Sequence, residues 1–177
     1  MQKLKKHRIF IGIPITKSFQ KEILEWGKGY QNLPVRWVRL EDFHFTLIPP
    51  WYTENLEKEK KSLLDFKAFK SFQLKLTNIT FGPNPNYPRL IWASGKSPKQ
   101  IIVLKEKLSK VFPNKEANRD FSLHLTIARF RQKDFKNFTI KSINESISWK
   151  IETKELALFE SHLSRRGAYY EKLFSVF

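Results

Sequence analysis

Phe-Ser-Leu-His-Leu-Thr-Ile-Ala-Arg-Phe-Arg, residues 121–131, contains the motif from which the fold of this chain can be predicted. Its core, His124-Leu-Thr126-Ile, repeats an upstream His44-Phe-Thr46-Leu, and 80 residues separate both the histidines and the threonines. Successive side chains of a strand point to opposite faces, so a histidine and a threonine two residues apart share one face. The apolar residues around each pair share the other face. Each copy therefore predicts a strand with a buried apolar side and a polar side that carries histidine and threonine.

Composition and charge narrow the class of protein. The chain has 177 residues, of which 41% are hydrophobic and 15% aromatic, and this is enough for one packed domain. Lys and Arg number 33 against 17 Asp and Glu, so the net charge is +16, which favours a nucleic acid or a nucleotide as the partner. Cysteine is absent, which excludes disulfides, thiolate nucleophiles and cysteine-ligated metals. No apolar run approaches the length of a membrane span, and we expect a cytoplasmic protein with no membrane partner.

The same order of elements occurs on both sides of the turn-rich loop Gly82–Pro88. Before the loop, the apolar patterns predict strands and two helices, namely strands at 8–15, 34–38, 43–48 and 72–81 and helices at 17–30 and 53–67. After it, they predict a strand, a helix and three more strands, namely strands at 89–94, 121–130, 147–160 and 169–177 and a helix that starts near 97. Strand, helix and His/Thr strand therefore occur twice.

Three local signals predict where these elements begin or end. Pro49-Pro50 ends the first His/Thr strand, because proline has no backbone N–H for a sheet. Thr53 begins the second helix as its N-cap, and Thr16 or Ser18 begins the first. Ser97-Pro98-Lys-Gln100 reads as a capping box for the third.

The repeat predicts an α+β fold made by internal duplication, with two lobes and a groove between them. We expect residues 1–177 to form a single domain with an internal pseudo-twofold repeat, approximately 8–81 and 89–177. The two histidines would then meet across the groove.

Two symmetry-related imidazoles suit a reaction that removes a proton on one side and delivers one on the other. With an ordinary pKa near 6.5, one histidine can act as base and the other as acid near neutral pH. In-line attack at phosphorus needs both, and the hydroxyls of Thr46 and Thr126 can donate to the phosphoryl oxygens as charge develops. His7 and His162 lack this repeated context and are expected to be structural or exposed.

A metal site is the weaker interpretation of the same residues. Asp42 and Asp120 share the parity of the histidines but are expected to flank the starts of the strands. No cofactor or metal is therefore predicted. Arg129 could hold a phosphate bidentately. Strict alternation, however, puts it on the face opposite His124, so it reaches the cleft only if the strand ends, twists or bulges after Ala128.

The paired His-x-Thr motifs resemble the signature of the two-histidine phosphoesterase superfamily. The wider pattern is similar to its RNA 2′,3′-cyclic phosphodiesterase branch, also called the 2′-5′ RNA ligase family, from Arg8 to Leu173. Further segments carry this likeness, namely Arg8-Ile-Phe-Ile, Arg36-Trp37-Val, His124-Leu-Thr-Ile-Ala-Arg129, Leu156-Ala-Leu-Phe-Glu-Ser161, Gly167 and Tyr170-Glu-Lys-Leu. Pro49-Pro50 departs from the family, where Lys-Phe-Leu-Gly is more usual.

The resemblance implies two antiparallel-sheet lobes flanked by outer helices, with both histidines in the central cleft. It implies metal-independent hydrolysis of RNA 2′,3′-cyclic phosphate ends to 2′-phosphates, with reversible 2′-5′ ligation as a second activity. His44 would be the proton donor and His124 the proton acceptor, while Thr46, Thr126 and Arg129 hold the phosphate. The expected partner is RNA with a cyclic phosphate end, tRNA fragments included, and the expected state is a monomer.

Two other functions stay open at this point. The first is a non-catalytic module that binds RNA ends through its charge and its aromatic side chains. The second is a phosphodiesterase of the same architecture that acts on small cyclic nucleotides or 2′-5′ oligonucleotides. The near-symmetry of the two motifs also leaves the roles of acid and base undecided by the sequence alone.

Overall fold

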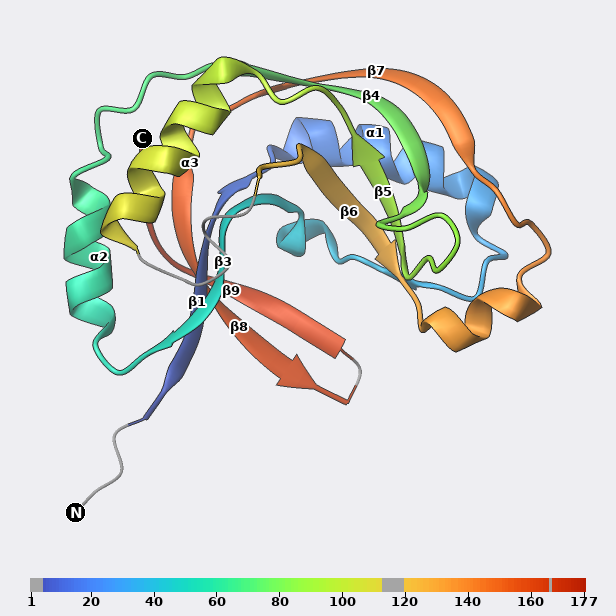
Figure 1. Ribbon diagram of the computed structural model, residues 1–177, viewed down its shortest axis with the longest axis horizontal. Coiled ribbons are helices and arrows are strands. Elements are labelled where there is room, and N and C mark those ends of the chain that lie inside the picture. The colour runs from blue at the N-terminus through green and yellow to red at the C-terminus, as the bar shows by residue number, and fades with distance from the viewer. Residues whose placement is uncertain (1–4, 113–119, 166) are drawn as a thin grey trace.

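The computed structural model of the chain describes residues 5–112, 120–165 and 167–177 (Figure 1). Within this part, two antiparallel sheets and their covering helices share a large hydrophobic core. The predicted α+β fold with two antiparallel-sheet lobes is confirmed.

Each of the two sheets contains strands from both halves of the sequence. The first sheet has the order β3 (His44–Thr53), β1 (His7–Pro14), β8 (Leu156–Ser164) and β9 (Gly167–Val176). The second has the order β2 (Arg36–Trp37), β6 (His124–Arg129), β5 (Leu90–Ser94), β4 (Gln73–Gly82) and β7 (Asn144–Glu152). Apart from the short β2, the orders match strand for strand, with β3 in the place of β6 and β1 in the place of β5. Each lobe is thus built from strands of both sequence halves.

The helices lie outside the sheets and cross between the halves in the same way (Figure 1). α1 (Lys17–Gly27) follows β1 of the first sheet but packs Phe19 edge-on against Trp149 of β7 in the second, at 5.5 Å between ring centroids. α2 (Leu56–Leu64) and α3 (Lys99–Val111) lie beside the first sheet, where Phe112 follows α3 and contacts Trp51 of β3 at 5.8 Å. In the described part of the chain, three short 3₁₀ helices connect these elements, namely η1 (Lys28–Tyr30), η2 (Leu40–Asp42) and η3 (Gln132–Asn137). Among the described residues, no helix is long and apolar enough to span a membrane.

β3 does not end at Pro49-Pro50 as predicted; it continues to Thr53. The strand lies at the edge of its sheet, so one side of its backbone needs no partner. The register against β1 also slips here, because Ile9 faces Trp51 while Ile11 faces Ile48. The two prolines therefore fall in a β-bulge, one of the few positions where a strand tolerates them.

The predicted starts of two helices were wrong, whereas Thr16 does cap α1. Asn55, not Thr53, caps α2, and its side-chain oxygen accepts a hydrogen bond from the Lys58 N–H at 2.9 Å. At α3 the extended residue Pro98 takes the cap position, so Ser97 comes one residue too early to cap it. The Ser97 hydroxyl instead accepts from the Leu123 N–H at 3.1 Å, which ties the start of α3 to the segment before β6.

The predicted long strand at 147–160 is two strands in different sheets, β7 and β8. The chain changes sheet at Thr153, a fully buried residue between them. Its hydroxyl donates to the Phe72 carbonyl at 2.7 Å and accepts from the Phe72 N–H at 2.9 Å. These tertiary bonds, which the local sequence does not reveal, turn the chain out of β7.

A substitution at Gly95 can test how closely the chain after β5 packs against β4. It follows Ser94, the partner of His124 in the sheet, and an alanine Cβ there would lie 2.0 Å from the Lys75 carbonyl oxygen of β4. We predict that Gly95→Ala lowers the free energy of unfolding by about 1–3 kcal/mol, because a sheet backbone must move to admit the methyl group. Urea denaturation would measure this. The matched control is Gly29→Ala, whose Cβ meets nothing within 4 Å and should change stability by no more than about 1 kcal/mol. Equal effects of the two substitutions would contradict the close packing of β5.

Candidate active site

A cavity of about 440 Å³ lies where the two sheets face each other. Its lining includes all five residues predicted for the site, namely His44, Thr46, His124, Thr126 and Arg129. The first two come from β3 in one sheet and the last three from β6 in the other.

Each histidine strand carries one extra residue at the same place after its motif. In β3 the pairing with β1 passes from Thr46 to Ile48, so Leu47 is the extra residue. In β6 the pairing with β5 passes from Thr126 to Ala128, so Ile127 is the extra residue. Both are β-bulges, and both leave two consecutive residues buried where alternation allows only one.

The bulge in β6 explains how Arg129 enters the cavity. Without it, an odd-numbered residue would point away from the face of His124. The extra residue Ile127 shifts the alternation by one, so Arg129 regains the face of the motif. The sequence predicted that Arg129 reaches the cavity only if the strand ends, twists or bulges after Ala128. The structure has such a bulge, one residue earlier, at Ile127.

Both histidines have the same orientation. The Nδ1 atom of His44 lies 2.6 Å from the Asp42 carbonyl oxygen, and that of His124 lies 2.8 Å from the Ser122 carbonyl oxygen. A carbonyl oxygen only accepts, so Nδ1 carries the proton in each neutral ring. Nε2 is then the atom free to exchange a proton, and in His44 it lies 3.1 Å from the Thr46 hydroxyl.

The surroundings of the two imidazoles differ. Three aromatic rings pack around His44, namely Phe10, Phe159 and Tyr170 at centroid distances of 4.7, 5.6 and 5.0 Å. His124 lies against Trp92 at 4.8 Å. Burial lowers the pKa of His44 from 6.5 to about 4, helped by the positive field of Arg129 and opposed by the hydrogen bond to Asp42. Burial also lowers the pKa of His124, again helped by Arg129. Both rings are therefore neutral at pH 7.

Arginines and tyrosines that the sequence analysis did not select complete the wall of the cavity. Arg36 and Arg39 line it together with Tyr169 and Tyr170 of β9. The Arg36 guanidinium donates to the Ala168 carbonyl at 3.2 Å, and Arg39 lies over the Tyr169 ring at 5.3 Å. In the sequence, Arg36 was noted only within Arg36-Trp37-Val, one of the segments that carry the family resemblance. Its spacing gave no sign that it would contact β9.

The carboxylate of Asp42 supports this wall through its hydrogen bonds. Its buried carboxylate accepts two hydrogen bonds from Arg39, at 2.6 and 3.0 Å, and one from the Tyr170 N–H at 2.9 Å. The expectation that Asp42 flanks the start of the strand agrees with its place in η2, next to β3.

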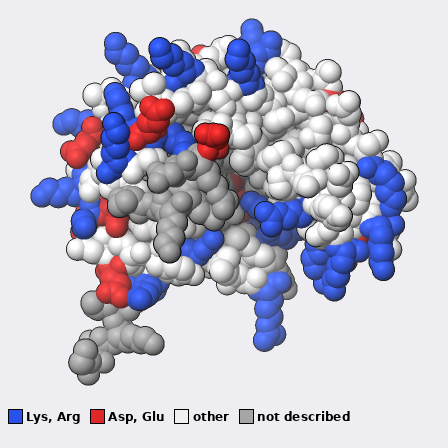
Figure 2. All heavy atoms as spheres, in the orientation of Figure 1, with Lys and Arg blue, Asp and Glu red and all other residues white. Residues whose placement is uncertain are grey.

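The wider surface is basic. Figure 2 shows Lys and Arg side chains along the margins of one face, with fewer Asp and Glu side chains among them. This distribution suits a polyanion that extends beyond the cavity.

Comparison with known families agrees with the paired histidine strands. The family model described as LigT like phosphoesterase matches residues 13–92, which contain the first His/Thr strand. In this region the chain is similar to the LigT like phosphoesterases. Curated relatives match the chain over nearly its whole length. The RNA 2′,3′-cyclic phosphodiesterase of Methanocaldococcus jannaschii is 28% identical over 171 residues, which are 93% of this chain and 96% of that protein. The protein of the same name from Archaeoglobus fulgidus is 24% identical over 177 residues, or 94% and 97% of the two chains.

Solved structures share the fold of this chain. TT0787 of Thermus thermophilus superposes with a TM-score of 0.73 at 18% identity, covering 96% of both chains. The crystal structure of E. coli LigT complexed with 3′-AMP gives a TM-score of 0.71 at 23% identity, covering 97% of both chains. The arrangement of two facing sheets is thus common to these proteins.

The burial of His44 predicts its titration. In the folded protein its ring should stay neutral until the pH approaches about 4, whereas the unfolded chain takes up the proton near 6.5. The unfolded state therefore binds more protons in this window, so the free energy of unfolding should decrease as pH falls from 6.5 toward 4. Histidine NMR resonances would measure the pKa, and His44→Gln should remove part of the stability loss. A His44 resonance that titrates at 6.5 or above would contradict the burial.

Proposed function

We propose that this phosphoesterase hydrolyses RNA 2′,3′-cyclic phosphate ends to 2′-phosphates without a metal ion. One observation carries the proposal: His44 and His124 line one cavity, and in each a backbone carbonyl holds Nδ1, so that Nε2 is the nitrogen that can transfer a proton. The RNA 2′,3′-cyclic phosphodiesterases to which the chain is similar over nearly their whole length support this substrate.

In the proposed reaction, water attacks phosphorus as the bond between phosphorus and the 3′ oxygen breaks. Nε2 of His124 takes the proton of the water, and Nε2–H of His44 gives a proton to the departing oxygen. The products are a 2′-phosphomonoester and a free 3′-hydroxyl. The assignment of His44 as acid and His124 as base rests on the family resemblance. If the 5′-hydroxyl of a second RNA attacked phosphorus in place of water, the same step would form a 2′-5′ phosphodiester, and this ligation would be reversible.

The acid must gain a proton that it lacks in the free protein. A bound phosphodiester is an anion, and an anion next to an imidazole raises its pKa. Binding of the substrate would therefore help to charge His44, and release of the product would return the ring to its neutral form. The buried position of His44 makes it sensitive to the substrate charge, because few water molecules screen the interaction.

The other three residues would hold the phosphate. The hydroxyls of Thr46 and Thr126 share the face of the histidines and can donate to the non-bridging oxygens. Arg129 supplies a positive charge at the same cavity. Tyr169 and Tyr170 would offer aromatic surfaces to the nucleotide.

The decisive experiment uses an RNA oligonucleotide with a 2′,3′-cyclic phosphate end in excess EDTA. We predict conversion to a 2′-phosphate, detected by phosphorus NMR, and a loss of about 10²–10⁴ in kcat for both His44→Gln and His124→Gln. Both variants should still bind the RNA. A cyclic end that is bound but never converted would favour an RNA-end binding module. Full activity in both variants would contradict the acid–base pair.

Arg129 has a matched control just beyond the end of β6, the exposed Arg131, which pairs with Asp134 at 2.7 Å. We predict that Arg129→Gln lowers kcat/KM by about 10²–10³, because a charge directed at the developing phosphoryl charge is lost. Arg131→Gln should change it little, since an exposed ion pair contributes only weakly. Steady-state kinetics of both variants at one salt concentration would measure this. Equal losses would assign the effect of Arg129 to general attraction of RNA.

The proposal also covers the size of the substrate, the oligomeric state of the protein and its cellular compartment. We expect a polymer, tRNA fragments included, so KM should rise steeply with salt, whereas a small cyclic nucleotide would give a shallow dependence. We also propose that the protein works as a monomer in the cytoplasm.

A further inference from the structure

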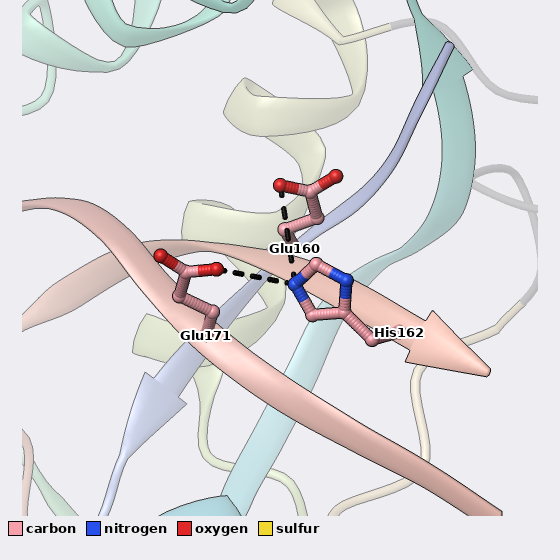
Figure 3. A group of neighbouring side chains, drawn as sticks. All are labelled: Glu160, His162 and Glu171. Atoms are coloured by element: carbon pink, nitrogen blue, oxygen red, sulfur yellow. Dashed lines mark hydrogen bonds and ion pairs between the residues drawn. The ribbon is translucent and has the colours of Figure 1, made fainter. Parts of the chain in front are cut away.

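A second group of ionisable side chains lies on the β8–β9 hairpin, on the sheet face opposite the aromatic rings around His44. Glu160 follows Phe159 and Glu171 follows Tyr170, so both glutamates point away from the rings that contact His44. His162 lies two residues after Glu160 and shares its face. Figure 3 shows both carboxylates directed at the same nitrogen of His162.

The distances suit a metal ion. Nε2 of His162 lies 3.1 Å from Oε2 of Glu171 and 4.0 Å from Oε2 of Glu160. The ligand atoms of all three residues lie within 4.8 Å of one another. A tetrahedral Zn²⁺ with bonds of about 2.0–2.2 Å separates its ligand atoms by roughly 3.4 Å. The two distances to His162 bracket this value, and all three pairs stay within 4.8 Å, so small side-chain shifts would bring the three ligand atoms to it.

His7 already holds Glu160 in the required orientation. Its Nδ1 lies 2.8 Å from Oε1 of Glu160, which leaves Oε2 as the oxygen that faces His162. Glu160 is itself buried, with 8% of its surface exposed, so this carboxylate has little freedom to turn away. An outer hydrogen bond that orients a ligating side chain is a usual feature of protein metal sites.

The register of the hairpin places two like charges together. Glu160 and Glu171 are direct partners across β8 and β9, an arrangement that destabilises an antiparallel pair. The chain has a net charge of +16 and is rich in lysine and arginine. The side chain toward which both carboxylates point is nevertheless a histidine, His162. A divalent cation would turn the repulsion into attraction.

We propose that Glu160, His162 and Glu171 bind one divalent transition-metal ion, with Zn²⁺ as the best fit. One imidazole and two carboxylates suit zinc and its neighbours in the first row, whereas Ca²⁺ and Mg²⁺ prefer oxygen ligands alone. Water would complete the coordination. The ion would fasten β8 to β9, the hairpin that supplies Tyr169 and Tyr170 to the cavity wall. It takes no part in the proton transfers proposed for His44 and His124.

Zinc binding to the full chain tests the proposal directly. Protein treated with EDTA and desalted should bind Zn²⁺ with a stoichiometry of one in calorimetry, and its Tm should rise with zinc concentration. Glu171→Gln and His162→Gln should each weaken binding by at least about tenfold. Both positions are partly or fully exposed, so neither variant should prevent folding. The matched control is Glu155→Gln, which removes a nearby carboxylate that pairs with Lys172 and should leave zinc affinity unchanged.

Co²⁺ gives an independent readout through its visible ligand-field bands. Co²⁺ bound at this site should show bands typical of a low-coordinate mixed nitrogen and oxygen environment, and Glu171→Gln should abolish them. The absence of saturable Zn²⁺ binding to the folded wild type would overturn the proposal. Binding that persists in Glu171→Gln and His162→Gln but disappears in His44→Gln would also overturn it, because the ion would then lie in the cavity. These measurements use the protein alone, so they stand apart from any result on RNA hydrolysis.

Discussion

The site depends on one backbone constraint, the extra residue that each histidine strand carries just after its threonine. Leu47 in β3 and Ile127 in β6 each break the alternation of their strands at the same place. Before the break, histidine and threonine face the cavity while their apolar neighbours enter the core. After it, the alternation is reversed, so the strand can bring Arg129 to the cavity without losing the burial of Ala128. A regular strand of the same sequence would have to bury the guanidinium or withdraw it from the site, and burial of an unpaired charge is the costlier outcome.

Each sheet contains strands from both halves of the sequence, so the cavity forms only when the whole chain has folded. β8 and β9 come from the end of the sequence but extend the sheet of β1 and β3, and β9 supplies Tyr170 to the surroundings of His44. The carboxylate of Asp42 then ties the Tyr170 backbone to the segment just before His44. The environment that lowers the pKa of His44 is therefore assembled from the N-terminal and C-terminal segments together, and neither half could provide it alone.

Much of this site could be predicted from the sequence, because its signals are local and repeated. The alternation of side chains along a strand predicts that each histidine and its threonine share one face. The place of Arg129 could also be predicted, because a bulge in the strand was one of the ways considered for it to reach the cleft. The passage of β3 through Pro49-Pro50 could not be predicted, since it depends on the edge position of the strand. The group around Glu160 was missed for a similar reason. Its members lie on three strands, and only the register of β8 against β9 brings Glu171 next to Glu160.

A nearly symmetric backbone still gives two inequivalent imidazoles, and the difference lies in what the side chains add. The residue five positions after His124 is Arg129, whereas the residue five positions after His44 is Pro49, which carries no charge. Three aromatic rings pack around His44, whereas His124 contacts Trp92. The buried ring responds most strongly to a charge that arrives with the substrate, because the low dielectric around it magnifies the interaction. Proton donation and proton acceptance can thus be divided between two copies of one motif, with the division set by the residues around the motif and not by the motif itself.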